Sequence, residues 1–214
     1  MEFATGKCLL RPWRKEDKPA LIEAGNNRKV WRNLTHMFPH PYTEADADQW
    51  FEFIATVPES THFAIEVDGR AIGGVGGVIG QGIFAKTAEF GYWIGEPWWG
   101  KGIATSAARA FTRHLMAAHR LHRIQAYVFA WNPGSQRVLE KCGFVREAVL
   151  ARSAVKDGQV VDELLFALTD HRLHMLRAPL RILSDSQRDE DWLHSRRSQP
   201  AAPPEQSAAA LPVA

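Results

Sequence analysis

The sequence predicts an α+β fold, with a mixed, mostly antiparallel sheet of about seven strands and helices on both faces. Short apolar or alternating segments and longer segments with helical periodicity follow one another along the chain. Asp-Gly pairs at 68–69 and 157–158 separate strand-like segments and indicate β-hairpins. A glycine-rich turn at 100–102 lies between a strand and a long helix. At 214 residues, the chain can bury one substantial core.

The strands are predicted from apolar or aromatic segments without helical period, and the helices from apolar residues at helical spacing. The predicted strands are residues 8–12, 62–67, 70–80, 87–94, 123–129, 145–156 and 159–168. The predicted helices are residues 17–24, 44–56, 103–119 and a short helix between 132 and 143. The third strand is unusually rich in glycine at 73–77, which predicts a bulge or a close backbone contact.

The C-terminal part of the chain differs in composition from the rest. Residues 1–170 are predicted to form the domain, and residues 171–194 a charged, moderately helical extension. Residues 195–214 are mostly Pro, Ala, Ser and Gln, a composition that favours disorder. The extension is expected either to pack on the domain or to mediate pairing with another chain.

The composition excludes several function classes. The 26 basic and 24 acidic residues give a formal net charge of +2, too balanced to indicate nucleic acid or an anionic membrane as a partner. No apolar run approaches the roughly 20 residues of a transmembrane helix, and the first seven residues lack the layout of a signal peptide. Only two cysteines are present, so we expect a reducing, cytoplasmic location. None of the nine histidines has a metal-ligand spacing, so no metal is predicted.

The turn at residues 100–104 predicts an anion site. Gly100 and Gly102 allow close approach of a ligand to the backbone, and the helix that follows presents free N–H groups and the positive end of its dipole. The pattern is not the P-loop, and Thr105 stands where the dinucleotide fingerprint needs its third glycine. A phosphate-bearing ligand of another kind is therefore expected.

A second segment, one strand further along the chain, has a related layout. Asn132 is a suitable N-cap for a short helix, Pro133 fits its first turn, and Gly143 is a suitable C-terminal cap. The whole region is thus strand, glycine-rich turn, helix, strand, polar turn and short helix.

These two segments together resemble the GNAT acyl-CoA N-acyltransferases, in the branch of the RimJ/RimL-type ribosomal-protein acetyltransferases. The resemblance rests on Gly100-x-Gly102-x-Ala104, on Asn132-x-x-Ser135, on residues 139–144 and on the substrate-side segment 37–47. It covers residues 7–168 and implies the GNAT fold. It also implies acetyl-CoA as the acyl donor and a primary amine as the acceptor, either a protein N-terminus or a small molecule.

The resemblance also implies which residues hold acetyl-CoA: backbone groups at the end of the strand for the pantetheine arm, and the loop amides for the pyrophosphate. The expected residues are Trp93, Ile94, Trp99, Gly100, Lys101, Gly102, Ile103, Ala104, Thr105, Asn132 and Lys141. Many family loops carry Gln or Arg where Trp99 stands, so the resemblance implies the backbone contacts to phosphate here and not a side-chain contact.

Glu89 is the candidate general base, because it lies in the strand that leads to the loop and shares a face with Gly91 and Trp93. The alternative is an edge glutamate that is solvated or salt-bridged. Ser135 is the candidate acid for the leaving thiolate, as the resemblance implies, and helix capping or a hydrogen bond to CoA are its alternatives. Tyr127 is an alternative catalytic group, and Cys142 reads as a buried small residue rather than a nucleophile.

The acceptor groove is expected between the early helices and the last hairpin. Candidate lining residues are Trp31, Phe38, His40 and Tyr42. The main prediction is a cytoplasmic acetyl-CoA-dependent N-acetyltransferase, either monomer or homodimer. Two alternatives remain open: a CoA-binding regulatory module without turnover, and an oligomeric scaffold that uses residues 171–214.

Overall fold

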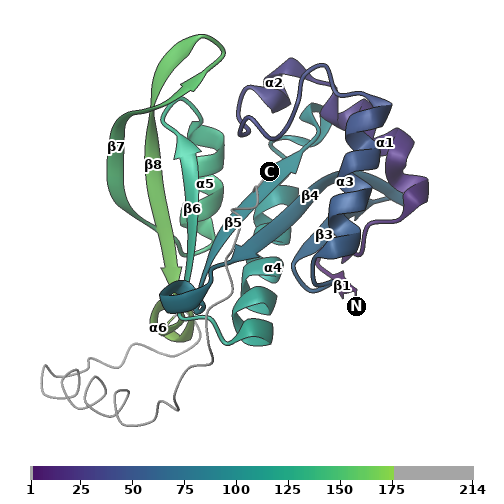
Figure 1. Cartoon of the computed structure of the whole chain (residues 1–214). Coiled ribbons are helices and arrows are strands. Elements are labelled where there is room, and N and C mark those ends of the chain that lie inside the picture. The colour runs from purple at the N-terminus through teal and green to yellow at the C-terminus, as the bar shows by residue number, and fades with distance from the viewer. Residues whose placement is uncertain (1, 176–214) are drawn as a thin grey trace, which may run out of the picture.

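One eight-stranded sheet runs through the part of the chain that the computed structural model describes, residues 2–175 (Figure 1). The strands lie in the order β1-β2-β3-β4-β5-β6-β8-β7. Every neighbouring pair is antiparallel except β5 and β6, which are parallel. The fold class predicted from the sequence is therefore confirmed.

The strands are β1 (Phe3–Ala4), β2 (Leu9–Arg11), β3 (His62–Val67), β4 (Arg70–Ile79), β5 (Thr87–Ile94), β6 (Arg123–Phe129), β7 (Val145–Lys156) and β8 (Gln159–Thr169). The α-helices are α1 (Lys18–Gly25), α2 (Arg28–Trp31), α3 (Glu44–Thr56), α4 (Ile103–His119), α5 (Pro133–Lys141) and α6 (Asp170–Met175). Within residues 2–175, no helix combines the length and the apolar character needed to cross a membrane.

The sequence missed two short elements, β1 and α2. A strand of two residues and a helix of four carry too few side chains to show a period. The sheet consequently has eight strands rather than about seven. Of the predicted extension, the structure describes only α6, and the remaining residues, 176–214, lie outside the described part of the chain.

Both predicted hairpin turns are present. Asp68 and Gly69 have φ values of 51° and 78°, and Asp157 and Gly158 have φ values of 52° and 72°. Positive φ at both central residues matches the right-handed twist of the flanking strands, which explains why Asp-Gly is a reliable signal at these two places.

The close backbone contact predicted for the glycine-rich strand is confirmed in β4. A Cβ atom on Gly73 would lie 2.3 Å from the carbonyl oxygen of Trp93, and one on Gly77 would lie 2.5 Å from Leu115. Because the first distance is to the backbone and far below van der Waals contact, only glycine lets β5 pair this closely with β4, whereas a larger residue at Gly77 would displace the Leu115 side chain of α4.

Two apolar clusters lie on the two faces of the sheet. The larger includes buried residues of α4 and α5, such as Phe111 and Leu139, and the smaller includes residues of α1 to α3, such as Leu21 and Ala47. Successive residues of β5 point to alternate clusters, with Phe90 in the larger and Trp93 in the smaller.

The parallel pairing of β5 with β6 ends early, and this opens the sheet. Only Thr87, Ala88 and Glu89 of β5 pair with β6, at Arg123, Ile124 and Gln125. Beyond Glu89, β5 stays paired with β4, while β6 stays paired with β8 (Figure 1). The two halves of the sheet therefore separate toward the C-terminal ends of β5 and β6.

Helix α3 begins with a capping box, which gives a first testable prediction. The Oγ1 of Thr43 accepts from the N–H of Asp46 at 3.3 Å, and the Asp46 carboxylate accepts from the N–H of Thr43 at 2.7 Å. Thr43→Ala is expected to lower the free energy of unfolding by about 1 kcal/mol, because an N–H of the first turn loses its acceptor. Thermal unfolding checks this, with a Tm decrease of about 2–4 °C expected. An unchanged Tm would mean that water replaces the cap.

Candidate active site

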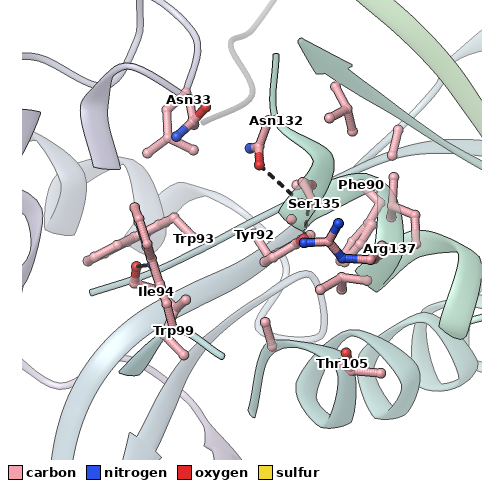
Figure 2. A pocket seen from close by; sticks show the side chains of 18 of the residues that line it. Asn33, Phe90, Tyr92, Trp93, Ile94, Trp99, Thr105, Asn132, Ser135 and Arg137 are labelled. Carbon is pink, nitrogen blue, oxygen red and sulfur yellow. Dashed lines mark hydrogen bonds between the residues drawn. The ribbon is translucent and has the colours of Figure 1, made fainter. Parts of the chain in front are cut away.

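A cavity of about 480 Å³ fills the opening between β5 and β6 (Figure 2). Its walls come from β5, from the glycine-rich loop and the first turn of α4, from β6, and from α5 along its whole length. Four residues at and after α2 also line it, as does one residue of β8. The cavity thus forms where the two halves of the sheet separate, and both glycine-containing segments singled out from the sequence open into it.

The loop before α4 has the geometry of an anion site. Gly100 and Gly102 have φ values of 73° and 75°, in the left-handed region that favours glycine. Helix α4 begins at Ile103, and no side chain caps it. Its first intrahelical hydrogen bond runs from the N–H of Ser106 to the carbonyl of Gly102 at 3.1 Å. The preceding N–H groups of the first turn therefore have no intrahelical acceptor, and they lie at the wall of the cavity.

The structure brings the predicted acetyl-CoA residues together around this cavity, with one exception. The lining residues among them are Trp93, Ile94, Trp99, Gly100, Gly102, Ile103, Ala104, Thr105, Asn132 and Lys141. Lys101 is the exception: it does not line the cavity, and its Nζ lies 4.8 Å from the ring centroid of Trp98. The indole N–H of Trp99 donates to the carbonyl of Ile94 at 2.7 Å, so this side chain braces the loop against β5.

Lys7 is a loop contact that sequence reasoning missed. Its Nζ donates to the carbonyl of Lys101 at 2.7 Å, across 94 residues of sequence. A Cβ atom on Gly102 would lie 3.3 Å from the same nitrogen. No local pattern connects a lysine before β2 with this loop, so the contact is a consequence of the tertiary fold.

Two carboxylates meet on one face of the opening. Glu89 lies on β5, and Glu163 lines the same cavity from β8. Burial raises the pKa of Glu89 above its usual range, and the negative charge of Glu163 raises it further. Tyr127 lines the cavity from β6, where its pKa is also raised, first by burial and then by these two carboxylates. Glu163 was missed, although Asp162 and Glu163 are conspicuous as an acidic pair in an otherwise apolar strand.

Ser135 lies across the cavity, at the start of α5, and two hydrogen bonds fix its position (Figure 2). Its backbone N–H donates to the Oδ1 of Asn132 at 3.1 Å, and its Oγ lies 2.9 Å from the hydroxyl of Tyr92. Tyr92 comes from β5, three residues after Glu89, and therefore points to the opposite face of the sheet. The cavity thus has carboxylates on one side and two hydroxyls on the other.

The four predicted acceptor residues lie outside the cavity wall. Phe38 and Tyr42 are buried in the smaller core cluster, at 4% and 5% exposure, so packing accounts for both. The ring of Trp31 lies beside that of His40, and the Nζ of Lys156 lies 3.9 Å from the ring centroid of Trp31. The residues from this segment that do line the cavity are Val30, Asn33, Leu34 and Thr35.

Helix α2 is tied to the turn between β7 and β8. The carboxylate of Asp157 accepts from Arg28 at 2.7 Å and lies 3.5 Å from Arg32. Both elements lie at the end of the molecule where the sheet opens (Figure 1). The segment after α2 therefore covers the cavity on the side of the last hairpin, in the region where the acceptor groove is expected.

Cys142 is buried, as the sequence indicated, and its thiol lies 3.5 Å from the carbonyl of Thr105. Burial raises the pKa of this thiol to about 11, so it stays protonated near neutral pH. Because the thiolate is the nucleophile in cysteine chemistry, Cys142 is a packing residue.

Comparison with known proteins identifies similar chains. The family model for the acetyltransferase (GNAT) domain matches residues 7–145. A probable N-acetyltransferase of Bacillus subtilis, YjcK, is 37% identical over 83 residues, which are 39% of this chain and 46% of YjcK. The ribosomal protein uS5-alanine N-acetyltransferase of Escherichia coli is 37% identical over 79 residues, 37% of this chain and 41% of that enzyme. The chain thus matches less than half of the length of either relative.

Among solved structures, RimJ of Mycobacterium smegmatis, in complex with CoA-disulfide, is 27% identical with a TM-score of 0.65. The alignment covers 79% of this chain and 88% of RimJ. The two segments that carry the resemblance in the sequence therefore lie in a fold similar to that of a CoA-bound relative.

Proposed function

Since this chain belongs to the GNAT acetyltransferase family and is similar to members of the RimJ/RimL type, we propose that it transfers an acetyl group from acetyl-CoA to a primary amine. The acceptor is either a protein N-terminal α-amine or a small-molecule amine. Transfer is direct, with donor and acceptor bound together. The observation that carries the proposal is the cavity, which has open N–H groups at one end and two carboxylates at the other.

The cavity suits the chemistry of CoA at its loop end. The N–H groups of Ile103, Ala104 and Thr105 have no intrahelical acceptor, and phosphate oxygens are fitting partners for such groups at a helix N-terminus. Lys141 lines the same cavity and carries a positive charge. We assign the N–H groups, with the backbone of Gly100 and Gly102, to the pyrophosphate, and Lys141 to the nucleotide phosphate.

The reaction needs no covalent enzyme intermediate, because acetyl-CoA supplies a thioester that an amine can attack directly. The burden on the enzyme is to deliver the amine uncharged. At pH 7 this costs about 1.4 kcal/mol for an α-amine with a pKa near 8, and about 4.6 kcal/mol for a lysine with a pKa near 10.4. A weakly basic carboxylate is therefore sufficient for an N-terminal acceptor.

Glu89 is the proposed base. Its raised pKa makes it a better proton acceptor than an ordinary glutamate, and Glu163 beside it favours a positively charged amine over a neutral molecule. Ser135 is the proposed proton donor on the opposite side of the cavity. The C–N bond forms as the C–S bond breaks, with its electron pair going to sulfur. An acceptor that enters as an ammonium first loses one proton to solvent water through Glu89, which leaves the carboxylate free again. During transfer the nitrogen loses a second proton to Glu89, sulfur gains one from Ser135, and water returns the proton from Glu89 to Ser135.

The test is acetyl transfer by the purified full chain. Acetyl-CoA is mixed with peptides that begin with alanine, serine or other residues, and separately with polyamines and amino acids. Release of free thiol is followed, and mass spectrometry locates the acetyl group. We include alanine and serine peptides because two relatives are named as ribosomal-protein alanine and serine acetyltransferases.

One acceptor class is expected to give saturable thiol release. Thiol release without any acetylated amine would indicate hydrolysis and contradict the proposal. No release at all, together with tight CoA binding by calorimetry, would favour a binding module instead.

A further inference from the structure

We propose that Tyr92 is a positioning residue for acetyl transfer. Its hydroxyl donates a hydrogen bond to the Oγ of Ser135 and so leaves the serine hydrogen free for the departing sulfur. The proposal rests on the role assigned to Ser135 above. The observation that carries it is the pair of hydroxyls, 2.9 Å apart at the wall of the cavity.

The direction of this hydrogen bond follows from what surrounds each hydroxyl. Burial raises the pKa of Tyr92, so the phenol keeps its hydrogen across the range in which the enzyme works. Ser135 is the only hydrogen-bond partner of that hydroxyl among the side chains and backbone of residues 2–175. If Ser135 were the donor, the phenol hydrogen of the half-buried Tyr92 would have no acceptor among the described residues, whereas the serine hydrogen can turn into the cavity when Tyr92 donates. Tyr92 is therefore the donor and Ser135 the acceptor.

Other parts of the fold hold Tyr92 and Ser135 in place, in addition to the hydrogen bond between them. The ring of Tyr92 stacks against that of Phe90 at a centroid distance of 5.7 Å, and Phe90 in turn stacks on Phe111 and Phe144. Asn132 holds the backbone of Ser135 from the other side. With the ring and the helix end both fixed, the hydroxyl of Tyr92 limits the orientations open to the serine hydrogen.

This arrangement matters chemically at the moment when the C–S bond breaks. The electron pair of that bond goes to sulfur, and the hydrogen of Ser135 moves toward the new negative charge. As it does so, the serine oxygen gains negative charge, which the hydrogen bond from Tyr92 stabilises. Tyr92 keeps its own proton throughout. Its raised pKa makes it a hydrogen-bond donor and argues against a role as the proton source.

The experiment compares Tyr92→Phe, Ser135→Ala and the double variant. Tyr92→Phe keeps the ring and its stacking, so the thermal unfolding midpoint should stay close to that of the parent chain. We expect kcat to fall about tenfold, because the serine hydrogen loses its fixed direction, while KM for acetyl-CoA stays unchanged. In the Ser135→Ala background, Tyr92→Phe should have no further effect on kcat, because two residues that act as one unit are not additive.

A second readout does not depend on turnover. In the complex with CoA, the pKa of the CoA thiol is measured by the ultraviolet absorbance of the thiolate as the pH is raised. A hydrogen bond from Ser135 favours the thiolate, so Tyr92→Phe and Ser135→Ala should each raise this pKa, by about one unit for the serine variant. The matched control is Tyr127→Phe. Tyr127 lines the same cavity, but its hydroxyl lies near Gln125, so its effects should be additive with those of Ser135→Ala.

Two results would overturn the inference while leaving the proposed function intact. In the first, Tyr92→Phe keeps full kcat and an unchanged CoA thiol pKa, while Ser135→Ala lowers kcat and raises that pKa. The other is an undiminished effect of Tyr92→Phe in the Ser135→Ala background, which would make the two hydroxyls independent. Full activity of Ser135→Ala would instead remove the role of Ser135, and this inference with it, while acetyl transfer itself would stand.

Discussion

Replacing Glu89 by glutamine is expected to lower kcat by about 10²–10⁴-fold and to leave the affinity for CoA close to that of the parent chain. The amide keeps the size and hydrogen bonding of the side chain but cannot take a proton from the amine. Glu89 lies on the carboxylate side of the cavity, away from the glycine-rich loop, so CoA binding should not depend on its charge. The measurements are steady-state kinetics with the acceptor found above, and calorimetry with CoA.

The pH dependence provides a sharper form of this prediction. Since burial and Glu163 raise the pKa of Glu89, the acidic limb of kcat/KM should lie above the usual range of a glutamate. Glu163→Gln removes one of these two causes, so it should move that limb to lower pH. An acidic limb that does not move in Glu163→Gln would mean that another group is the base.

Stability should change in the opposite sense from activity. The pKa of Glu89 is higher in the folded than in the unfolded chain, so its ionisation favours the unfolded state. This destabilisation is absent below the ordinary carboxyl range and grows as the pH rises to the raised pKa of Glu89. Glu89→Gln should therefore unfold at a higher temperature than the parent chain at neutral pH, and the difference should vanish in acid. A lower Tm at neutral pH would contradict the assigned environment.

Replacing Gly102 by valine is expected to raise the Kd for CoA by about 10- to 100-fold. Gly102 has a φ of 75°, and a β-branched residue in this region costs on the order of 1–3 kcal/mol. The loop of the variant should relax to another conformation and turn its N–H groups away from the cavity. The new side chain would also crowd Lys7, whose Nζ would lie 3.3 Å from its Cβ. Calorimetry with CoA measures the effect.

The chain offers a matched control for this experiment. Gly69 has a φ of 78°, and a Cβ atom there would have no neighbour within 4 Å. It lies in the hairpin turn between β3 and β4 and does not line the cavity. Gly69→Val therefore introduces similar backbone strain and should lower the Tm without changing the Kd for CoA. An equal loss of affinity in both variants would mean that strain acts through global stability, and the loop would lose its assigned role.

Most of the secondary structure could be predicted because its signals are local. β3, β5, β6 and β7 and helices α3 and α4 have the boundaries expected from the sequence, since each combines a clear period with turn or cap residues at its ends. Helix α2 has an N-cap residue, Asn27, but its four residues are too few to show a period, although the ion pair between Arg28 and Asp157 ties it to the last hairpin beside the cavity. For this reason the sequence did not predict the residues after α2 that line the cavity.

The sequence by itself determined the family, the glycine-rich loop, the short helix after Asn132 and the position of Glu89, because each depends on residues close together in the chain. Only the tertiary structure brought Tyr92 to Ser135, Glu163 to Glu89 and Lys7 to the loop. Lys7 and Lys101 lie in connecting segments, whereas the other two pairs join different strands and helices across the opening, where the early end of the pairing between β5 and β6 separates the strands. That separation depends on the packing of whole layers on both faces of the sheet, which no local pattern of residues encodes.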